Sequence, residues 1–371
     1  MTKTKRPKIL IAAGGSGGHI FPAIAMARAM RESSDVDIRF IGSSKALDRR
    51  ILEKEGFNYS TLSSNKFPYG LSLELLPFSF KLILDMIRAN AIVLSYRPDV
   101  VIGFGGYIAS PIVLAASMFG IPRIVHEQNV VPGRANRFLF RFADKIAVSF
   151  NETMKLTGPS AAKCVFTGNP IRGEVLKGDR AGGIKRFGLD EAKFTILVMG
   201  GSQGAHFLNE NFIAAFESFD DGTRRSFQVI HLTGVKDYEW AIKTYSALQG
   251  LESRVYSFID RIEEAYSAAD LIVTRAGASA IFEVAHFAKP MILVPYPFAM
   301  NHQAENAKAF KDNGAAIMIE EKDLIPKIFK EHILRLFRDK EERRKLSEAA
   351  KRMSVPEAST NLAREVLRLT L

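Results

Sequence analysis

Two glycine-rich loops in this chain have the composition of phosphate-binding turns. The first, Gly14–His19, reads GGSGGH, and the second, Gly200–Ala205, reads GGSQGA. Each loop follows a short apolar run and precedes a segment with the apolar spacing of a helix. Glycine lets the backbone approach a ligand, and the amide groups at a helix start attract an anion. The loops therefore predict phosphate binding at both places, and a plain tight turn is the alternative for each.

The first loop differs from a dinucleotide-binding loop. Ile20 stands where the pattern G-x-G-x-x-G needs its third glycine, and the next apolar run ends in Phe40-Ile41-Gly42 without a ribose-binding acid. The phosphate-loop pattern of nucleotide triphosphatases is absent from the sequence as well. These differences argue against a nicotinamide-dependent oxidoreductase, which is the alternative from another enzyme class.

Proton-transferring side chains follow several apolar runs. His19 closes the first loop and is a candidate general base or phosphate donor, because an unperturbed imidazole has a pKa near 6.5. A hydrogen-bonded structural histidine is the alternative. The run His126–Asn129, HEQN, ends a strand at the edge where open α/β sheets bind ligands. Val130 replaces the second histidine of the zinc motif H-E-x-x-H, so this run is not a zinc site.

A carboxylate near the start of a later helix is a candidate ribose ligand. The segment Arg275–Ala278, RAGA, follows an apolar run, and Glu283 lies on the helix that begins there. Its carboxylate can accept hydrogen bonds from both hydroxyls of a ribose; taken alone, an interaction with the helix dipole is favoured. Asp35-Val36-Asp37 resembles a metal-binding D-x-D motif but precedes an early strand, so we expect a solvated loop and no bound metal. Cys164, the single cysteine, is expected to pack, and a reducing compartment is favoured.

Short apolar runs alternate with helix-length segments along the whole chain, which is typical of parallel sheets covered by helices on both faces. The expected strands are 8–13, 37–41, 99–104, 123–127 and 145–148, followed by 194–199, 228–232, 254–258, 271–274 and 291–294. The expected helices include 21–32, 46–55 and 209–219, and the charged tail from Leu324 is helical, with a last helix over 358–371.

The openings KILIAAGGSGGH and FTILVMGGSQGA are alike, so the chain is an α/β protein of two similar doubly wound domains. The joint is expected within TGNPIRG at 167–173, where Gly, Asn and Pro cluster. We expect one domain over 1–168 with the last helix, 357–371, packed back on it, and a second over 169–356. A cleft between two such domains is the default ligand site.

The formal net charge of +11 suits nucleic acid, anionic lipid or phosphate-bearing substrates. A nucleic-acid binder is disfavoured because the sequence has no basic stripe interleaved with aromatic residues. The uncharged stretch 100–122 is long enough to cross a bilayer, but its glycines and prolines favour a buried strand, turn and helix. The stretch Phe67–Ile87, rich in Phe and Leu with Lys81 inside it, is expected to contact a membrane; a core-facing helix is the alternative.

Eight segments in order resemble the MurG family of bacterial glycosyltransferases. They read GGSGGH, GFGGY, HEQN, GNPIR, GGSQGA, FIDRI, RAGA with Glu283, and NHQAEN, and they span residues 14 to 306. The resemblance implies a GT-B fold, with two facing Rossmann-like domains. It implies inverting transfer of N-acetylglucosamine from its uridine diphosphate to undecaprenyl-diphospho-muramoyl-pentapeptide, without a cofactor or metal. It also implies a peripheral enzyme on the cytoplasmic face of the bacterial inner membrane, bound to its anionic surface and not to nucleic acid.

The resemblance carries residue roles onto matching positions. The second domain would hold the donor: backbone of Ile259 at uracil, Glu283 at ribose, and Ser202 at the diphosphate. The first domain would meet the acceptor through the first loop and His19. The remaining expected contacts with donor or acceptor are Ser16, Gly17, Gly18, Tyr107, His126, Asn129, Arg172, Gln203, Asn209, Ala278, Ser279 and Gln303. Ser16 stands where the family commonly has threonine, which keeps the hydroxyl, and Ala276 stands where serine is frequent and receives no role.

The general base is predicted to be His19, with Glu127 as the alternate. The charge of the departing diphosphate would be met by Arg172, backbone amides and a helix dipole. The nearest alternative function is another inverting GT-B transferase acting on a glycolipid acceptor, such as a diacylglycerol or a sterol. The glycine loops and Glu283 fit that alternative, whereas HEQN and GGSQGA fit it less well.

Overall fold

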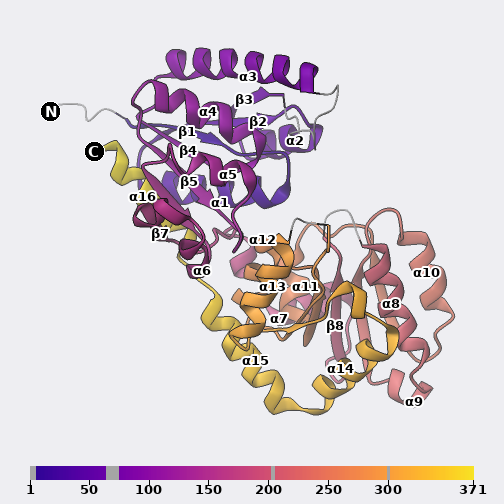
Figure 1. Ribbon diagram of the computed structural model, residues 1–371. Helices are drawn as coiled ribbons and strands as arrows, with labels where there is room; N and C mark the ends of the chain where they lie inside the picture. The colour runs from indigo at the N-terminus through magenta and orange to yellow at the C-terminus, as the bar shows by residue number, and fades with distance from the viewer. Residues whose placement is uncertain (1–5, 64–74, 202–204, 299–300) are drawn as a thin grey trace. The chain divides into compact units, whose positions relative to one another are not determined.

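The computed structural model describes residues 6–63, 75–201, 205–298 and 301–371, with the side chains of 75–80 excepted. The chain forms two compact units (Figure 1). The first unit comprises residues 1–172 together with 356–371, and the second comprises 173–355. The division falls at the Arg172–Gly173 bond, inside the TGNPIRG segment.

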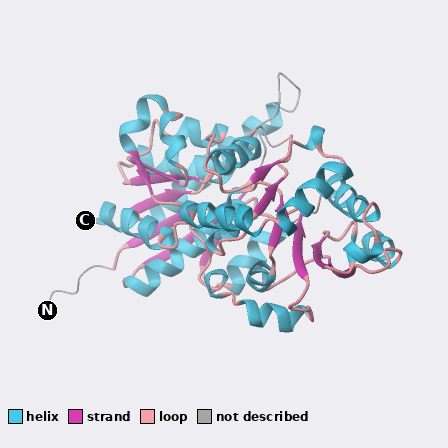
Figure 2. Ribbon diagram, turned by 90° about the horizontal axis from the view of Figure 1, so that it is seen from below, coloured by secondary structure: helices cyan, strands magenta, loops and turns pink. Residues whose placement is uncertain are grey.

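A parallel sheet of seven strands forms the centre of the first unit, in the order β3-β2-β1-β4-β5-β6-β7. Helices cover both faces of the sheet (Figures 1 and 2). The strands are β1 (Lys8–Ala12), β2 (Asp37–Ser43), β3 (Asn58–Leu62), β4 (Val100–Gly103), β5 (Arg123–Glu127), β6 (Lys145–Val148) and β7 (Cys164–Phe166). The helices are α1 (Gly17–Ser33), α2 (Ala46–Lys54), α3 (Leu75–Tyr96), α4 (Gly106–Met118), α5 (Arg134–Leu139), α6 (Asn151–Lys155), η1 (Gly158–Lys163), α16 (Ala358–Leu367) and η4 (Arg368–Thr370).

The second unit repeats this plan around six parallel strands in the order β10-β9-β8-β11-β12-β13. Its strands are β8 (Phe194–Met199), β9 (Phe227–Leu232), β10 (Glu252–Tyr256), β11 (Leu271–Thr274), β12 (Met291–Leu293) and β13 (Ile317–Met318). Its helices are η2 (Val175–Lys177), α7 (Arg180–Phe187), α8 (His206–Glu217), α9 (Asp221–Arg224), α10 (Tyr238–Ser246), α11 (Ile262–Ala268), α12 (Ala278–His286), α13 (His302–Asp312), η3 (Glu321–Asp323), α14 (Pro326–Arg338) and α15 (Lys340–Met353).

Each sheet reverses its strand order beside its first strand. In the first unit the chain moves outward from β1 to β3 and then crosses to β4 on the other side of β1. In the second unit the same change falls between β8 and β11. Loops at the carboxyl ends of such neighbouring strands diverge and leave room for a ligand. The expected fold of two Rossmann-like doubly wound domains is confirmed, and both glycine loops follow the first strand of their sheet.

Burial explains why the central strands were readable from the sequence. The side chains of Ile9, Leu10 and Ile11 in β1 have 0% exposure, because helices pack on both faces. Ile9 and Ile11 belong to the apolar cluster that the sheet forms with α1 and α16. Leu10, on the other face, belongs to the cluster formed with α3 and α4. A strand buried on both faces is a continuous apolar run, as in KILIA.

The edge strands β3, β7 and β13 are missed, because they are short or lack this continuous apolar pattern, whereas the edge strand β10 is predicted. β3 reads NYSTL, β7 has three residues and β13 has two. The expected helix 21–32 instead begins at Gly17, so that two loop glycines form its first turn and Pro22 lies inside it. α8 likewise begins at His206 rather than Asn209, and β10 begins two residues earlier than expected, at Glu252.

The last helix, α16, belongs to the first unit and packs against α1. Leu362 and Val366 are buried in the same apolar cluster as α1, and Lys145 pairs with Glu365 at 2.6 Å. The uncharged stretch 100–122 forms β4 and α4, which confirms a buried strand, turn and helix. Within the described residues, no helix combines the length and the apolar character needed to cross a membrane.

Candidate active site

A buried carboxylate binds the backbone of the first glycine loop. Asp48, on α2, is 1% exposed, and its Oδ2 accepts hydrogen bonds from the amides of Gly15 at 2.7 Å and Ser43 at 3.0 Å, and from the Ser43 hydroxyl. Lys45 Nζ donates to the Gly15 carbonyl at 2.8 Å. A Cβ atom on Gly14 would lie 2.4 Å from Asp48 Oδ2, so only glycine fits there. The amide and the carbonyl of Gly15 are therefore both held by side chains.

His19 lies in the first turns of α1, where the glycine loop becomes helical. Its Nδ1 is 3.1 Å from the hydroxyl of Ser16, which is exposed. The ring lies against Gly105 and Gly106, where added Cβ atoms would be 3.4 Å from Nε2 and Nδ1 respectively. Both glycines have positive φ, 90° and 72°, a conformation that favours glycine. The structure thus brings together Ser16, His19 and the GFGGY segment at the carboxyl ends of β1 and β4.

His126 is fully buried and turned into the protein. Its Nδ1 is 3.1 Å from Gln128 Nε2, and its Nε2 is 3.4 Å from the Gly168 carbonyl oxygen. Since the Gln128 amide donates to Nδ1, the ring proton belongs on Nε2. Burial lowers the pKa of His126 to about 4, so the ring is neutral near pH 7. This side chain supports the HEQN turn and the Gly168 turn from inside.

Glu127 is also buried, and its carboxylate organises the loop that follows β5. Oε1 accepts hydrogen bonds from the backbone amide of Asn129 at 2.9 Å and from its side chain at 3.2 Å. Oε2 accepts from the amide of Gly133 at 3.0 Å and from Asn136 Nδ2 at 2.8 Å. Four donors occupy the two oxygens, and this favours a structural role for Glu127 over that of a general base.

Two further expected residues belong to the first unit. Tyr107, at the start of α4, has 39% exposure. The guanidinium carbon of Arg172 lies 4.5 Å from the centroid of the Phe21 ring, on the second turn of α1. This stacking places a permanent positive charge beside the N-terminal turns of α1. Gly17 and Gly18 provide the first two residues of that helix.

In the second unit, α12 begins at the carboxyl end of β11 and carries Glu283 on its second turn. Helical side chains lean toward the helix N-terminus, so the carboxylate lies toward the first turn, where Ala278 and Ser279 are. Glu283 is 8% exposed, and the hydroxyl of buried Tyr266 donates to its Oε2 at 3.0 Å. The Ser279 hydroxyl is buried and has no hydrogen-bond partner within the described part of the chain.

A buried ion pair supports the loop after β12. Arg275 is 6% exposed, pairs with Glu321 and donates to the Val294 carbonyl at 3.2 Å. The same loop is tied to α13, because the Tyr296 amide donates to Gln303 Oε1 at 2.9 Å. The side chain of Arg275 thus connects the RAGA segment to the loop after β12. Gln303 lies at the start of α13.

The remaining donor candidates differ in what surrounds them. Ile259 lies in the loop between β10 and α11. Asn209 has 0% exposure: its amide donates to Asp237 at 2.7 Å and to the Thr233 carbonyl, and its Oδ1 meets His231 Nε2 at 3.0 Å. This buried network secures the first turn of α8, which follows the second glycine loop. Ser202 and Gln203 lie outside the described residues.

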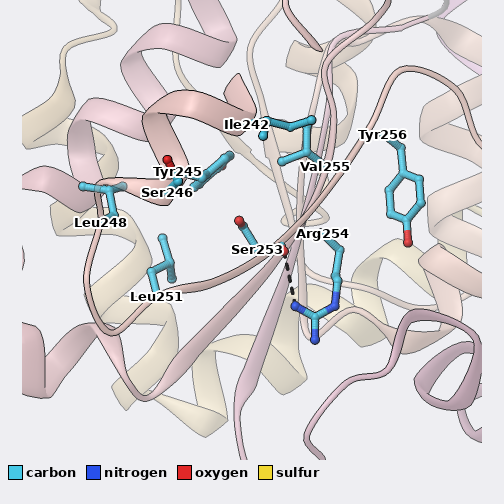
Figure 3. Close-up of a pocket in the computed structure, with 9 residues that line it drawn as sticks. All are labelled: Ile242, Tyr245, Ser246, Leu248, Leu251, Ser253, Arg254, Val255 and Tyr256. Carbon is cyan, nitrogen blue, oxygen red and sulfur yellow. Dashed lines mark hydrogen bonds between the residues drawn. The ribbon is translucent and has the colours of Figure 1, made fainter. Parts of the chain in front are cut away.

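A surface pocket of about 500 Å³ lies elsewhere, beside α10 and the outer strand β10 (Figure 3). Leu248, Val255 and Arg254 are among its lining residues, and none of the expected site residues lines it. The Arg254 guanidinium already donates to the carbonyls of Phe187, Gly188 and Ser253. The pocket flanks the edge of the sheet, whereas Ser16, Tyr107 and Ala278 follow the carboxyl ends of β1, β4 and β11.

Several supporting residues had no signal in the sequence. Asp48, Asn136 and Tyr266 belong to none of the motifs that the sequence singles out. Their partners lie 33, 9 and 17 residues away respectively, so no local pattern joins them. Asp35, in the D-x-D segment, pairs with Arg6 at 2.9 Å. Cys164 is half-buried in β7, where its sulfur lies 3.4 Å from the Thr157 hydroxyl.

Comparison with known proteins matches both units. The glycosyltransferase family 28 N-terminal domain matches residues 9–148, and its C-terminal domain matches residues 195–362. A protein of Halothermothrix orenii is 39% identical over 363 residues, which is 96% of this chain and 97% of the relative. A protein of Halalkalibacterium halodurans is 35% identical, over 96% of this chain and 97% of the relative. Both are named UDP-N-acetylglucosamine–N-acetylmuramyl-(pentapeptide) pyrophosphoryl-undecaprenol N-acetylglucosamine transferase.

Solved structures agree with the fold. The crystal structure of MurG from Acinetobacter baumannii has a TM-score of 0.77 and 25% identity, covering 98% of this chain and all of that one. A UDP-N-acetylglucosamine 2-epimerase from Neisseria meningitidis, solved with UDP-N-acetylglucosamine, has a TM-score of 0.71 at 12% identity, over 97% of this chain and all of that one. At that identity the second likeness shows the fold alone.

Proposed function

The chain belongs to glycosyltransferase family 28, and on that premise we propose that it transfers N-acetylglucosamine from UDP-N-acetylglucosamine to the muramoyl 4-hydroxyl of undecaprenyl-diphospho-muramoyl-pentapeptide. The observation that carries the proposal is 39% identity over 96% of the chain with a relative named for that transfer. The product is the lipid-linked disaccharide used in peptidoglycan synthesis.

The second unit binds the donor in this proposal. The backbone of Ile259 faces uracil, Glu283 accepts the ribose hydroxyls, and the N-terminus of α12 faces the diphosphate. The support is local: α12 has nine residues, its first turn includes Ala278 and Ser279, and Glu283 lies five residues after Ala278. Ser202 of the second loop is assigned to the diphosphate and Gln203 to substrate binding, and both lie outside the described residues. Gln303 contacts the sugar.

The first unit binds the acceptor. The amides of Gly17 and Gly18 at the start of α1 attract the acceptor diphosphate, because an α-helix N-terminus carries partial positive charge. Tyr107 contacts the acceptor, and Asn129 is assigned, with Gln303, to the transferred sugar. Arg172 stacked on Phe21 provides a fixed cation for the departing diphosphate. His126 and Asn209 are buried, so we propose that each acts by supporting its loop.

The chemical step is an in-line displacement at the anomeric carbon. The muramoyl 4-oxygen forms the new bond to C1, the bond from C1 to the diphosphate oxygen breaks, and its electron pair leaves with UDP. The configuration at C1 inverts. His19 Nε2 takes the hydroxyl proton in the tautomer in which Nδ1 donates to Ser16. Glu127 is the less favoured base, because four donors already occupy its oxygens.

We further propose that the enzyme works as a peripheral protein on the cytoplasmic face of the inner membrane. The support is an apolar face of α3: Leu82, Ile83 and Ile87 are 41%, 58% and 59% exposed. Exposed Lys81 and Arg88 flank them and would attract anionic lipid. The opposite face of α3 is buried through Asp85, Ala89, Val93 and Tyr96, so the helix both packs and presents apolar residues. Residues 67–74 of the expected membrane segment lie outside the described residues.

An acceptor comparison tests the proposed function. Purified enzyme is given radiolabelled UDP-N-acetylglucosamine with the undecaprenyl-linked muramoyl-pentapeptide, with a diacylglycerol or with a sterol. We expect label in the undecaprenyl-linked product alone, with a β-linkage by NMR. Transfer to the diacylglycerol or the sterol, with none to the undecaprenyl-linked acceptor, would identify the enzyme as a different glycolipid transferase.

A further inference from the structure

We propose that Tyr266 is a positioning residue that holds Glu283 in the orientation needed to bind the donor ribose. The inference rests on the proposed donor site and adds a residue to it. The phenol hydroxyl of Tyr266 donates to Glu283 Oε2 at 3.0 Å, from a side chain that is 1% exposed. The ring lies against Phe287, 5.8 Å between centroids. Packing alone would be satisfied by phenylalanine, whereas the hydroxyl is directed at a carboxylate.

The hydrogen bond matters because of what Glu283 must do. A glutamate side chain has three rotatable bonds, and holding it in one rotamer costs conformational entropy when ligand binds. Tyr266 fixes one oxygen in advance, so the carboxylate is already oriented when the ribose hydroxyls approach it. A carboxylate that is already held in its binding rotamer loses less entropy when the nucleoside binds. The Tyr266 hydroxyl therefore raises the affinity for the nucleoside without contacting it.

The position of Tyr266 also joins two parts of the donor site. It lies on α11, which begins three residues after Ile259 at the loop proposed to face uracil. Glu283 lies on α12, the next helix. The Tyr266–Glu283 bond therefore fixes the ribose carboxylate relative to the uracil loop. The other carboxylates on α11 are engaged elsewhere, since Glu263 and Glu264 pair with Arg261 at 3.4 and 2.7 Å. Glu283 is therefore the carboxylate assigned to ribose.

Calorimetric binding of UDP and of 2′-deoxy-UDP tests the inference, using wild type, Tyr266→Phe, Glu283→Ala and the double variant. We expect the wild type to prefer UDP. Tyr266→Phe should weaken UDP binding by about 5- to 20-fold and 2′-deoxy-UDP binding by less, so that the preference shrinks. In the Glu283→Ala background, Tyr266→Phe should change neither affinity, because a residue that acts through another has no effect once that partner is gone.

Tyr96→Phe is the matched control. Tyr96 is a buried tyrosine of the first unit whose hydroxyl donates to the Asp37 carbonyl at 2.8 Å, so its loss removes a comparable hydrogen bond. It should lower the melting temperature without changing the preference for UDP. A folded Tyr266→Phe protein that keeps wild-type affinity and preference overturns the positioning role. If Glu283→Ala itself keeps the preference for UDP, the ribose assignment of the proposed function is wrong instead.

Discussion

Asp48 Oδ2 accepts the amide hydrogen of Gly15 at 2.7 Å, although the two residues are 33 positions apart. The same oxygen accepts from the Ser43 amide and hydroxyl, so one atom ties the carboxyl ends of β1 and β2 together. Its partner Oδ1 is buried and accepts no hydrogen bond from the described residues. The glycine loop that we assign to the acceptor diphosphate is therefore held in place by a side chain of α2.

Replacing Asp48 should weaken acceptor binding and leave donor binding nearly unchanged. Asp48→Ala leaves three donors without an acceptor, at a cost of about 1–3 kcal/mol each, and should raise the KM for the acceptor about 10-fold or more. The KM for UDP-N-acetylglucosamine should change less than about 2-fold, because that site is assigned to the other unit. Steady-state kinetics with each substrate varied in turn provides the measurement.

Asp48→Asn is the companion variant, because its amide oxygen can replace Oδ2 while its nitrogen occupies the place of the partnerless Oδ1. It should retain most acceptor affinity. An Asp48→Ala enzyme that folds and binds acceptor normally, or that loses donor affinity equally, contradicts the assigned role of Asp48.

His19→Ala should lower turnover at least ~100-fold, the lower end of the effect of losing a general base. The profile of kcat against pH should also lose its acidic limb, because that limb reports protonation of the base. Glu127→Gln is the comparison: it should lower stability through the loop after β5 yet retain the acidic limb. A nearly unchanged rate for His19→Ala would remove this residue from the mechanism, and loss of the limb in Glu127→Gln alone would assign the base to Glu127.

Stability should fall as the pH is lowered from about 6.5 toward 4. Burial lowers the pKa of His126 to about 4 and that of His231 to about 3. The unfolded chain, with histidine pKa values near 6.5, takes up protons first, so acid favours unfolding. At pH 5 each of these histidines should lower the free energy of unfolding by about 2 kcal/mol relative to its value at pH 7.5. Urea unfolding at both pH values measures this difference.

His231→Phe isolates the contribution of the second unit. It should lower stability at pH 7.5, because Tyr245 and Asn209 lose a partner, but its stability should depend less on pH. Equal pH dependence in the variant and the wild type would mean that His231 is not buried in its neutral form.

The exposed face of α3 should carry membrane binding. Ile83→Glu with Ile87→Glu should weaken binding to vesicles containing phosphatidylglycerol at least ~10-fold, since two apolar side chains lose their burial in lipid. Ile325→Glu, at an exposed isoleucine of the second unit, is the control and should bind as wild type does. Co-sedimentation measures both. Unchanged binding of the α3 variant would place the membrane contact elsewhere.

The two doubly wound units and the segments at their strand ends can be predicted from local patterns in the sequence. β5, β6, β8 and β11 were predicted with the bounds that the structure has, because strands buried on both faces are continuous apolar runs. Glycine and polar residues at their carboxyl ends then marked where ligands bind in such sheets. These signals are local: each is contained within a dozen residues, so no knowledge of packing was needed.

Which polar side chains face inward depends on the packing of segments that are distant in the chain. His126, Glu127 and Asn209 looked alike as ligand contacts, yet all three are buried and bonded within the protein, whereas Ser16 and Tyr107 are exposed. Asp48 and Tyr266 acquired roles only when α2 and α11 were packed beside the loops that they hold. The direction of a side chain depends on helix packing between segments far apart in the chain, and no periodicity in the sequence records it.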